Sequence, residues 1–261
     1  MKLLAALLVV PLTSGMGWQV LAYRGIPPHD VRFSASGLRI DVRKSAAPLI
    51  YPLGQPVAVT TVRARGRISG TLNVPADRQG ESGFDDYAFR LGLVEVGERR
   101  LGFMERRLAP AWVRKLFSLA PLGMGVSRIR FFNVGVEPGQ IGRRREHPLS
   151  ELILEQVVTV PDREGRFELF VRLESAIETA AIWISTDGDD TRSTYTVTIE
   201  RIELNGPEGG LSGGFTFDAS GARAWTSRGV DPRGSTQRRT CLAYTAPAGV
   251  GPDSTRAERR P

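Results

Sequence analysis

The chain has few of the residues that build several common kinds of site. Its 261 residues include one Cys, two His and three Lys. A single Cys excludes an intramolecular disulfide framework and a Cys-rich zinc or iron–sulfur centre. Glycine-rich phosphate loops are also missing, since Gly123-Met124-Gly125 stands alone without the strand-to-helix setting that such a loop needs.

The positive charge comes almost entirely from Arg. The formal net charge is +7 and the pI is about 10.1. Residues 206–261 carry +3 of it, Lys2 adds +1, and residues 18–205 carry the other +3, which is ordinary for a domain surface. Since the Arg residues are spread through the predicted strands and no basic motif with interleaved aromatics occurs, we predict no nucleic-acid partner.

The N-terminus has the order of a secretory signal. Lys2 precedes an apolar run over 3–12, and small residues, including Gly15 and Gly17, follow it. The run is shorter than the ~20 residues that span a bilayer. We predict a signal peptide over 1–17, a periplasmic or secreted location and no stable membrane span after cleavage. A buried N-terminal strand or helix and an uncleaved anchor are the alternatives.

Residues 18–205 are mainly β by pattern. Apolar and polar residues alternate, as in half-buried strands, or β-rich runs end at turn residues. About eight such strands predict a β-sandwich or jelly roll, and the Pro, Asp and Gly within 161–165 predict a hairpin between the flanking strands. The predicted strands are 37–43, 57–66, 87–96, 128–134, 152–160, 166–173, 181–185 and 195–204.

One short inserted helix and a tail complete the predicted architecture. Pro110 suits the first position of a helix over 110–119, which would pack over an open end of the sandwich or act as a lid over a ligand groove. Residues 206–261 are rich in Gly and Arg, offer little to bury and predict a disordered tail that holds Cys241.

The densest polar cluster is the segment 185–193. Asp187, Asp189 and Asp190 lie within four residues, and a hard cation such as Ca²⁺ would relieve their repulsion. The spacing is not that of an EF-hand. A turn held by Asx hydrogen bonds and a ligand-contacting loop are the alternatives. No other cofactor is predicted.

A second polar cluster precedes the strand 87–96. Asp85 and Asp86 could orient a substrate hydroxyl, and Arg90 shares a strand face with Asp86. The alternative is structural: if Tyr87 and Phe89 face the core, the two acids lie on the surface, and a cross-strand partner makes Arg90 an ion-pair residue.

A third cluster surrounds His147. Ser150 and Glu151 follow it closely, which could suggest acid–base or nucleophilic chemistry. No Gly-x-Ser-x-Gly elbow and no His-Glu-x-x-His helix occur, so no catalytic residue is assigned and a loop fixture is the alternative. The preceding Arg143-Arg144-Arg145 could contact a phosphate or a carboxylated sugar, although a solvated loop is the default.

Three short segments carry a family resemblance. They are 34–38, 85–90 and 181–191. In this order they resemble a family of exported bacterial β-sandwich domains of unknown function, and the layout is similar to the galactose-binding-like jelly rolls used as carbohydrate-binding modules. The resemblance implies a bacterial envelope setting and glycan binding, and it transfers no catalytic residue.

Together these patterns favour an exported, non-catalytic β-sandwich that binds a carbohydrate or another envelope ligand. Aromatic faces beside polar groups are typical of such sites. The alternatives are a structural or scaffolding protein of the envelope and a carboxylate-dependent hydrolase, which would need Asp85, Asp86, Glu151 and Asp187 at one cleft. The predicted ligand-binding residues are Asp85, Asp86, Arg90, Trp112, His147 and Trp183.

Overall fold

The computed structural model describes residues 7–147, 150–207, 213–217, 223–230 and 236–238. The chain divides into two units, Met1–Gly210 and Leu211–Pro261. In the second unit, β12 (Gly213–Phe217), β13 (Arg223–Val230) and β14 (Thr236–Arg238) form an antiparallel three-stranded sheet. The rest of the predicted tail, including Cys241, lies outside the described residues.

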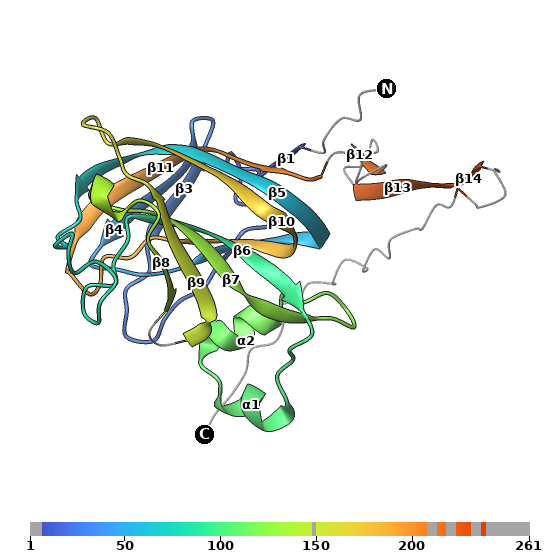
Figure 1. Cartoon of the computed structure of the whole chain (residues 1–261), viewed down its shortest axis with the longest axis horizontal. Coiled ribbons are helices and arrows are strands. Elements are labelled where there is room, and N and C mark those ends of the chain that lie inside the picture. Colours follow the sequence, from blue (N-terminus) through green and yellow to red (C-terminus); the bar gives the residue numbers. More distant parts are fainter. Residues whose placement is uncertain (1–6, 148–149, 208–212, 218–222, 231–235, 239–261) are drawn as a thin grey trace, which may run out of the picture. The chain divides into compact units, whose positions relative to one another are not determined.

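The first unit is mainly β, as predicted, and contains an 11-stranded sheet (Figure 1). The main path runs β3-β4-β11-β5-β10-β6-β7-β9-β8, with β1 on β11 and β2 on β5. All pairs are antiparallel except β7 with β9. The strands are β1 (Leu7–Val9), β2 (Gln19–Val20), β3 (Asp30–Ser34), β4 (Gly37–Arg43), β5 (Leu49–Thr71), β6 (Phe89–Gly97), β7 (Gly125–Val134), β8 (Arg144–His147), β9 (Ser150–Thr159), β10 (Arg166–Ser185) and β11 (Thr194–Asn205).

Two long strands turn this sheet into a sandwich. Residues 61–71 of β5 pair with β11, and the first part of β10 pairs alongside them. Residues 49–59 of β5 pair with the second part of β10, which also pairs with β6. Register shifts between Arg172 and Ile177 and between Thr179 and Ala181 of β10 mark irregularities of the kind that bend a strand. Each long strand therefore contributes to both layers.

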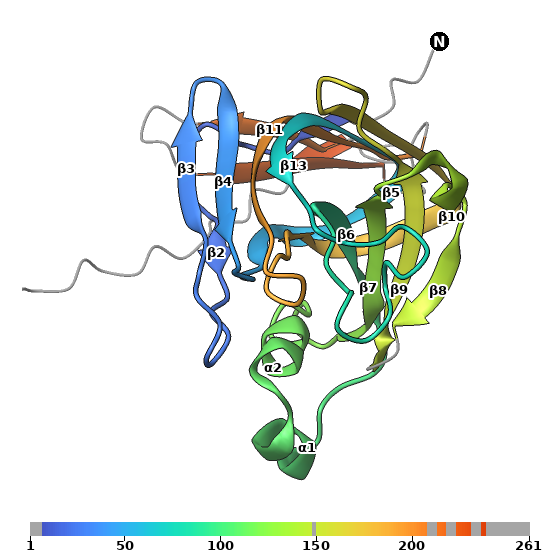
Figure 2. The same cartoon turned by 90° about the vertical axis from the view of Figure 1, so that its left-hand side faces the viewer.

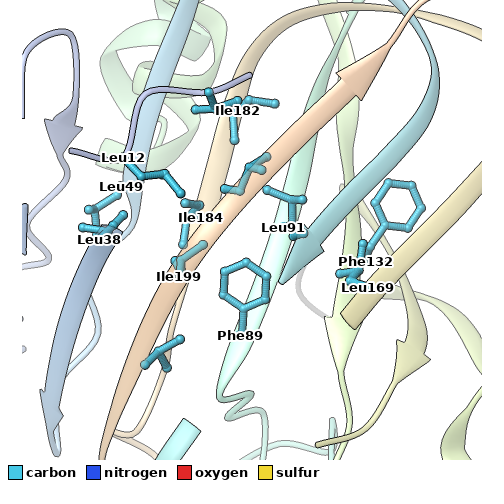
Figure 3. Packing of buried hydrophobic residues seen from close by; sticks show 14 of the residues in the cluster. Leu12, Leu38, Leu49, Phe89, Leu91, Phe132, Leu169, Ile182, Ile184 and Ile199 are labelled. Atoms are coloured by element: carbon cyan, nitrogen blue, oxygen red, sulfur yellow. The ribbon is translucent and has the colours of Figure 1, made fainter. Parts of the chain in front are cut away.

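The main core lies between the layers (Figure 3). Alternation places Leu38 and Ile40 of β4 on its inner face, and Leu91 of β6 and Ile184 of β10 meet them from the other layer. All four side chains are fully buried. Burying an aliphatic side chain contributes roughly 1.5–3 kcal/mol, so this interior is the main source of stability.

A second apolar cluster covers the outer face of the layer that contains β6 and β7. Trp183, Val94 and Ile129 belong to it, and the helix α2 (Ala111–Phe117) adds Val113 and Leu116. The predicted helix over 110–119 is confirmed within these bounds. The β6–β7 layer is therefore buried on both faces. Its outer face is covered by α2 and the neighbouring loops, and a cavity can form where this cover is incomplete.

The structure also departs from the predicted elements. A second helix, α1 (Phe103–Leu108), precedes α2, and a 3-10 turn spans Pro138–Gln140. The helix α1 ends at Leu108, and the next residue, Ala109, is extended because Pro110 follows it. No helix in the described part of the chain is long and apolar enough to cross a membrane.

The predicted hairpin over 152–173 is wrong. The turn at 161–165 exists, and Asp162 accepts hydrogen bonds from the backbone N–H groups of Glu164 and Arg166. However, β9 pairs with β7 and β8, while β10 pairs with β5 and β6. The residues of the turn predict that the chain reverses its direction there. They do not predict which strands pair, because pairing depends on all the strands of the sheet. The predicted strands 166–173 and 181–185 are parts of the single strand β10.

The described part of the predicted signal peptide is packed on the sheet. Leu7–Val9 pair with Asn205–Glu203 of β11, and Val10 and Leu12 are buried in the main core. Removal of residues 1–17 would delete β1 and these two core side chains. Residues 1–6 lie outside the described part, and export and cleavage stay predictions.

Candidate ligand-binding site

A cavity of about 320 Å³ opens on the outer face of the β6–β7 layer. The period-2 alternation of β10 turns Ile182 and Ile184 into the main core and Trp183 and Ser185 toward this cavity. The volume lies at the lower end of the range for ligand pockets, about 300–1,000 Å³. We call this space the Arg90 cavity.

The Arg90 cavity brings together all nine residues that the sequence singled out. The start of β6, the end of β8, the loop after β10 and the helix α2 each supply part of its wall. Residues 100 positions apart in the chain meet here because β6 and β10 are neighbours in the sheet. The nine are Asp85, Asp86, Arg90, Trp112, His147, Trp183, Asp187, Asp189 and Asp190.

Eight further lining residues were not among the predicted ligand-binding or metal residues, although Ser150 and Ser185 lie in two of the polar clusters. Most are ordinary strand or loop residues that carry no chemical signal of their own. They are Tyr23, Ile26, Ala46, Ile129, Phe131, Ser150, Ile153 and Ser185. Glu151, which the hydrolase hypothesis needed at the same cleft, is exposed instead and pairs with Arg99 at 2.5 Å.

Gly92 makes room for the apolar floor. A Cβ atom at this position would lie 2.8 Å from Cγ2 of Ile129 and 2.8 Å from Cε1 of Phe131. Both of these side chains line the cavity. A glycine on β6 therefore lets two side chains of β7 lie flat over the sheet.

Arg90 is the electrostatic centre of the cavity. Its side chain is 7% exposed, its Nη1 lies 3.0 Å from Oε1 of Glu155, and its Nη2 lies 3.3 Å from Oδ2 of Asp187 and 3.5 Å from Oδ2 of Asp85. It also donates to the carbonyl of Asp85 and stacks over the ring of Tyr87. A buried guanidinium needs such partners because desolvation of its charge is costly.

Arg145 and Glu155 extend the ion-pair network behind the cavity. Nη2 of Arg145 lies 2.5 Å from Oδ1 of Asp85 and 2.5 Å from Oε2 of Glu155. Arg145 is therefore not part of a solvated loop, although its neighbour Arg144 is 63% exposed. The network became possible because the parallel pairing of β9 with β7 places Glu155 beside Phe131 and near Arg90.

The pKa values of Asp85 and Asp187, the two acids that flank Arg90, are shifted in opposite directions. Burial alone would raise the pKa of Asp85, but the hydrogen bond from His147, at 2.6 Å, and the charges of Arg90 and Arg145 lower it to about 2. Burial raises the pKa of Asp187 to about 7 against the lowering charge of Arg90. One side of Arg90 is therefore anionic at neutral pH, while the other is close to its titration point.

Hydrogen bonds from neighbouring residues hold the Asp-rich segment 185–193 in place. Asp86 accepts hydrogen bonds from the backbone N–H of Thr191 at 2.7 Å and from its hydroxyl at 2.5 Å. The hydroxyl of Tyr195 donates to the carbonyl of Asp187 at 2.8 Å. Burial raises the pKa values of both Asp86 and Asp189, and the neighbouring acids add to this effect.

The expectation that Asp86 lies on the surface is wrong. Tyr87 and Phe89 do face the interior, but Asp86 is 1% exposed and Arg90 is 6% exposed as well. The outer face of this layer is covered by loops, and Arg90 has the buried partner Glu155 from β9. An alternating pattern assumes one solvated face, and here neither face is solvated.

His29 fixes the wall beside Asp187. The backbone N–H of Ala47 donates to its Nε2 at 2.9 Å, so this nitrogen must be unprotonated, and Nδ1 lies 2.8 Å from the Ser45 hydroxyl. Burial lowers the pKa of His29 to about 4, in keeping with a neutral ring. The adjacent Ala46 forms a β-bridge with Asp187, so the ring supports the cavity indirectly.

The geometry lends no support to the predicted calcium site. Within the described residues, no group of three or more His, Cys, Asp or Glu side chains is arranged to hold a metal ion. Asp187 already accepts a hydrogen bond from the Ser185 hydroxyl at 2.9 Å and faces Arg90. Calcium binding by Asp187, Asp189 and Asp190 stays a prediction.

A mainly β sandwich with a partly apolar, acid-lined cavity on one outer face is the class that fold and site define. No family model matches the chain, and no curated protein matches it. Among solved structures it is similar to a xylan-binding module, CBM15, with 10% identity and a TM-score of 0.35. The match covers 78% of this chain and 98% of that one.

Proposed function

We propose that the chain binds a carbohydrate in the Arg90 cavity. The observation that carries this proposal is the convergence of Trp112 and Tyr23, both partly exposed, with five aspartates around one small cavity. Aromatic rings bind the apolar faces of sugar rings, while ionised carboxylates accept hydrogen bonds from sugar hydroxyls. This combination of aromatic and acidic side chains in a cavity of about 320 Å³ suits a mono- or disaccharide unit.

The charges of the cavity favour a neutral or amine-bearing sugar. Its lining includes five aspartates, one arginine and one histidine. Arg90 is already paired with Asp85, Asp187 and Glu155, so its charge is not free to attract a ligand. An acidic sugar would therefore meet like charge, which disfavours binding.

Calorimetric titration of the full chain with three classes of oligosaccharide tests this proposal: neutral, amine-bearing and uronic-acid-containing. We expect binding in the first or second class and none in the third. Trp112→Ala should weaken binding roughly tenfold. The matched control is Phe170→Ala, a change at a 51% exposed aromatic residue outside the cavity. Binding of none of the classes, or equal affinity of wild type and Trp112→Ala, would contradict the proposal.

A carboxylate-dependent hydrolase is the second candidate. It is favoured by the divergent pKa values of Asp85 and Asp187, about 2 and about 7, because such pairs supply a base and an acid at neutral pH. Against it, Nη2 of Arg90 contacts both carboxylates and occupies the space between them. Release of reducing ends from the bound oligosaccharide, lost in Asp187→Asn, would establish hydrolysis, and its absence would leave binding as the function.

A further inference from the structure

The α1 part of the segment that joins β6 to β7 projects beyond the sandwich, whereas α2 packs on the outer face of the β6–β7 layer. The whole segment covers residues 98–124 and contains α1 and α2. Figures 1 and 2 both show α1 farther from the strands than α2. Only α2 contributes buried side chains, Val113 and Leu116, whereas α1 has none. We call residues 98–124 the helical insertion.

Large apolar side chains are exposed at the end of this insertion. Every residue of α1 is exposed, and Phe103, Met104 and Leu108 are 81%, 61% and 77% exposed. Leu122 and Met124 in the following loop are also exposed. Met104 and Leu108 are four positions apart, so they lie on one face of the helix, and Phe103 borders it. Side chains of this size remain in water only at a cost, which a partner surface would remove.

The same segment is strongly basic. It contains six basic and two acidic residues, a net charge of +4, although residues 18–205 as a whole carry only +3. The side chains of Arg106 and Arg107 are exposed and make no hydrogen bond or ion pair within the described part of the chain. The net charge of residues 18–205 therefore hides a local excess of positive charge in residues 98–124, which also carry the exposed apolar side chains.

We propose that the helical insertion binds the surface of an anionic lipid bilayer. Exposed aromatic and aliphatic side chains enter the boundary between headgroups and acyl chains, while arginines pair with anionic headgroups. A bilayer requires no complementary groove, and α1 offers protruding side chains rather than a groove. The charge of the insertion selects an anionic surface over a zwitterionic one.

Cosedimentation of the full chain with vesicles tests the inference. Vesicles of phosphatidylcholine alone are compared with vesicles that contain phosphatidylglycerol as well. We expect binding to the anionic vesicles only, and weaker binding at higher salt because screening reduces the attraction. Equal binding to both compositions, or no binding to either, would overturn the proposal.

Two variants separate the apolar contribution from the charge. Phe103→Ser combined with Met104→Ser and Leu108→Ser should reduce vesicle binding at least roughly tenfold. Arg106→Gln combined with Arg107→Gln should reduce it roughly fivefold for each arginine. All five side chains are exposed, so the fold should persist, which a thermal unfolding scan checks.

Matched controls use exposed residues elsewhere. Ile141→Ser with Phe170→Ser replaces two apolar side chains that are 50% and 51% exposed, and Arg24→Gln with Arg43→Gln removes the same charge. Both controls should bind like wild type. A loss as large as that in the α1 variants would show a nonspecific effect and overturn the assignment.

Sedimentation velocity tests whether a second copy of the chain, and not a bilayer, covers the apolar side chains of α1. A dimer that the triple serine variant dissociates, without vesicle binding, would also overturn the proposal.

Discussion

Replacement of Arg90 by Met should destabilise the fold in a pH-dependent way. The change removes the cation that Asp85, Asp187 and Glu155 share. Asp85 and Glu155 keep Arg145, which lies 2.5 Å from each of them. Asp187 keeps no cation among the ion pairs of the described residues, and it is 13% exposed. Breaking a buried pair by removing one partner costs about 3–5 kcal/mol, and we expect a loss of this size at pH 8.

The loss should be smaller at pH 5. The pKa of Asp187 is already raised to about 7 with Arg90 present, and without that cation it must rise further. A raised pKa means that the folded protein holds the proton more tightly than the unfolded chain, so stability from this group falls as pH rises from about 4 past 7. At pH 5 Asp187 is protonated, and the loss in Arg90→Met should be smaller by at least about 1 kcal/mol.

Urea unfolding at pH 5 and pH 8 measures both values. Arg32→Met serves as the control, because the Arg32–Asp30 pair is exposed and such pairs contribute little. Asp187→Asn should recover part of the loss in the Arg90→Met background at pH 8. A loss no larger than that of Arg32→Met, or an equal loss at both pH values, would refute the role assigned to Asp187.

Three further predictions address the cavity and its supports. Gly92→Ala should push Ile129 and Phe131 into the cavity and lower the free energy of unfolding by about 1–3 kcal/mol. It should also weaken the oligosaccharide affinity measured by calorimetry, and an unchanged affinity would contradict the role of Gly92. Leu116→Ala should cost about 2–5 kcal/mol by denaturant unfolding, because this side chain is fully buried under α2; a loss below that range would mean that α2 is loosely packed. His29 has a pKa lowered to about 4, so stability from this group falls as pH decreases from about 6.5 to 4. Urea midpoints should show this slope in wild type relative to His29→Asn, and identical slopes would refute it.

Local sequence patterns predicted the strands that bury one face more than the other. The strand 37–43 coincides with β4, and the alternation within 195–204 matches the burial of Val197 and Ile199 in β11. Period-2 burial is a property of the strand itself, so these assignments needed no knowledge of the neighbours. The polar clusters around Asp85 and Asp187 were also recognisable, because three or more polar residues interrupt apolar runs there.

Only the tertiary structure decided what surrounds those clusters. Glu155 and Arg145 resemble ordinary strand and loop residues, and the strand order β6-β7-β9-β8 is what brings them to Arg90. The same order overruled the predicted hairpin at 161–165. Strand pairing is chosen by the whole set of buried faces and not by the turn that precedes a strand.

The sequence by itself determined a mainly β chain, a helix near residue 112 and the residue types available for a site. The tertiary structure decided that all nine candidate residues line one cavity and that the apolar side chains of α1 are exposed beside Arg106 and Arg107. The physical reason is the same in both cases. Burial and the electrostatic environment depend on contacts between residues distant in the chain, and neither composition nor periodicity contains those distances.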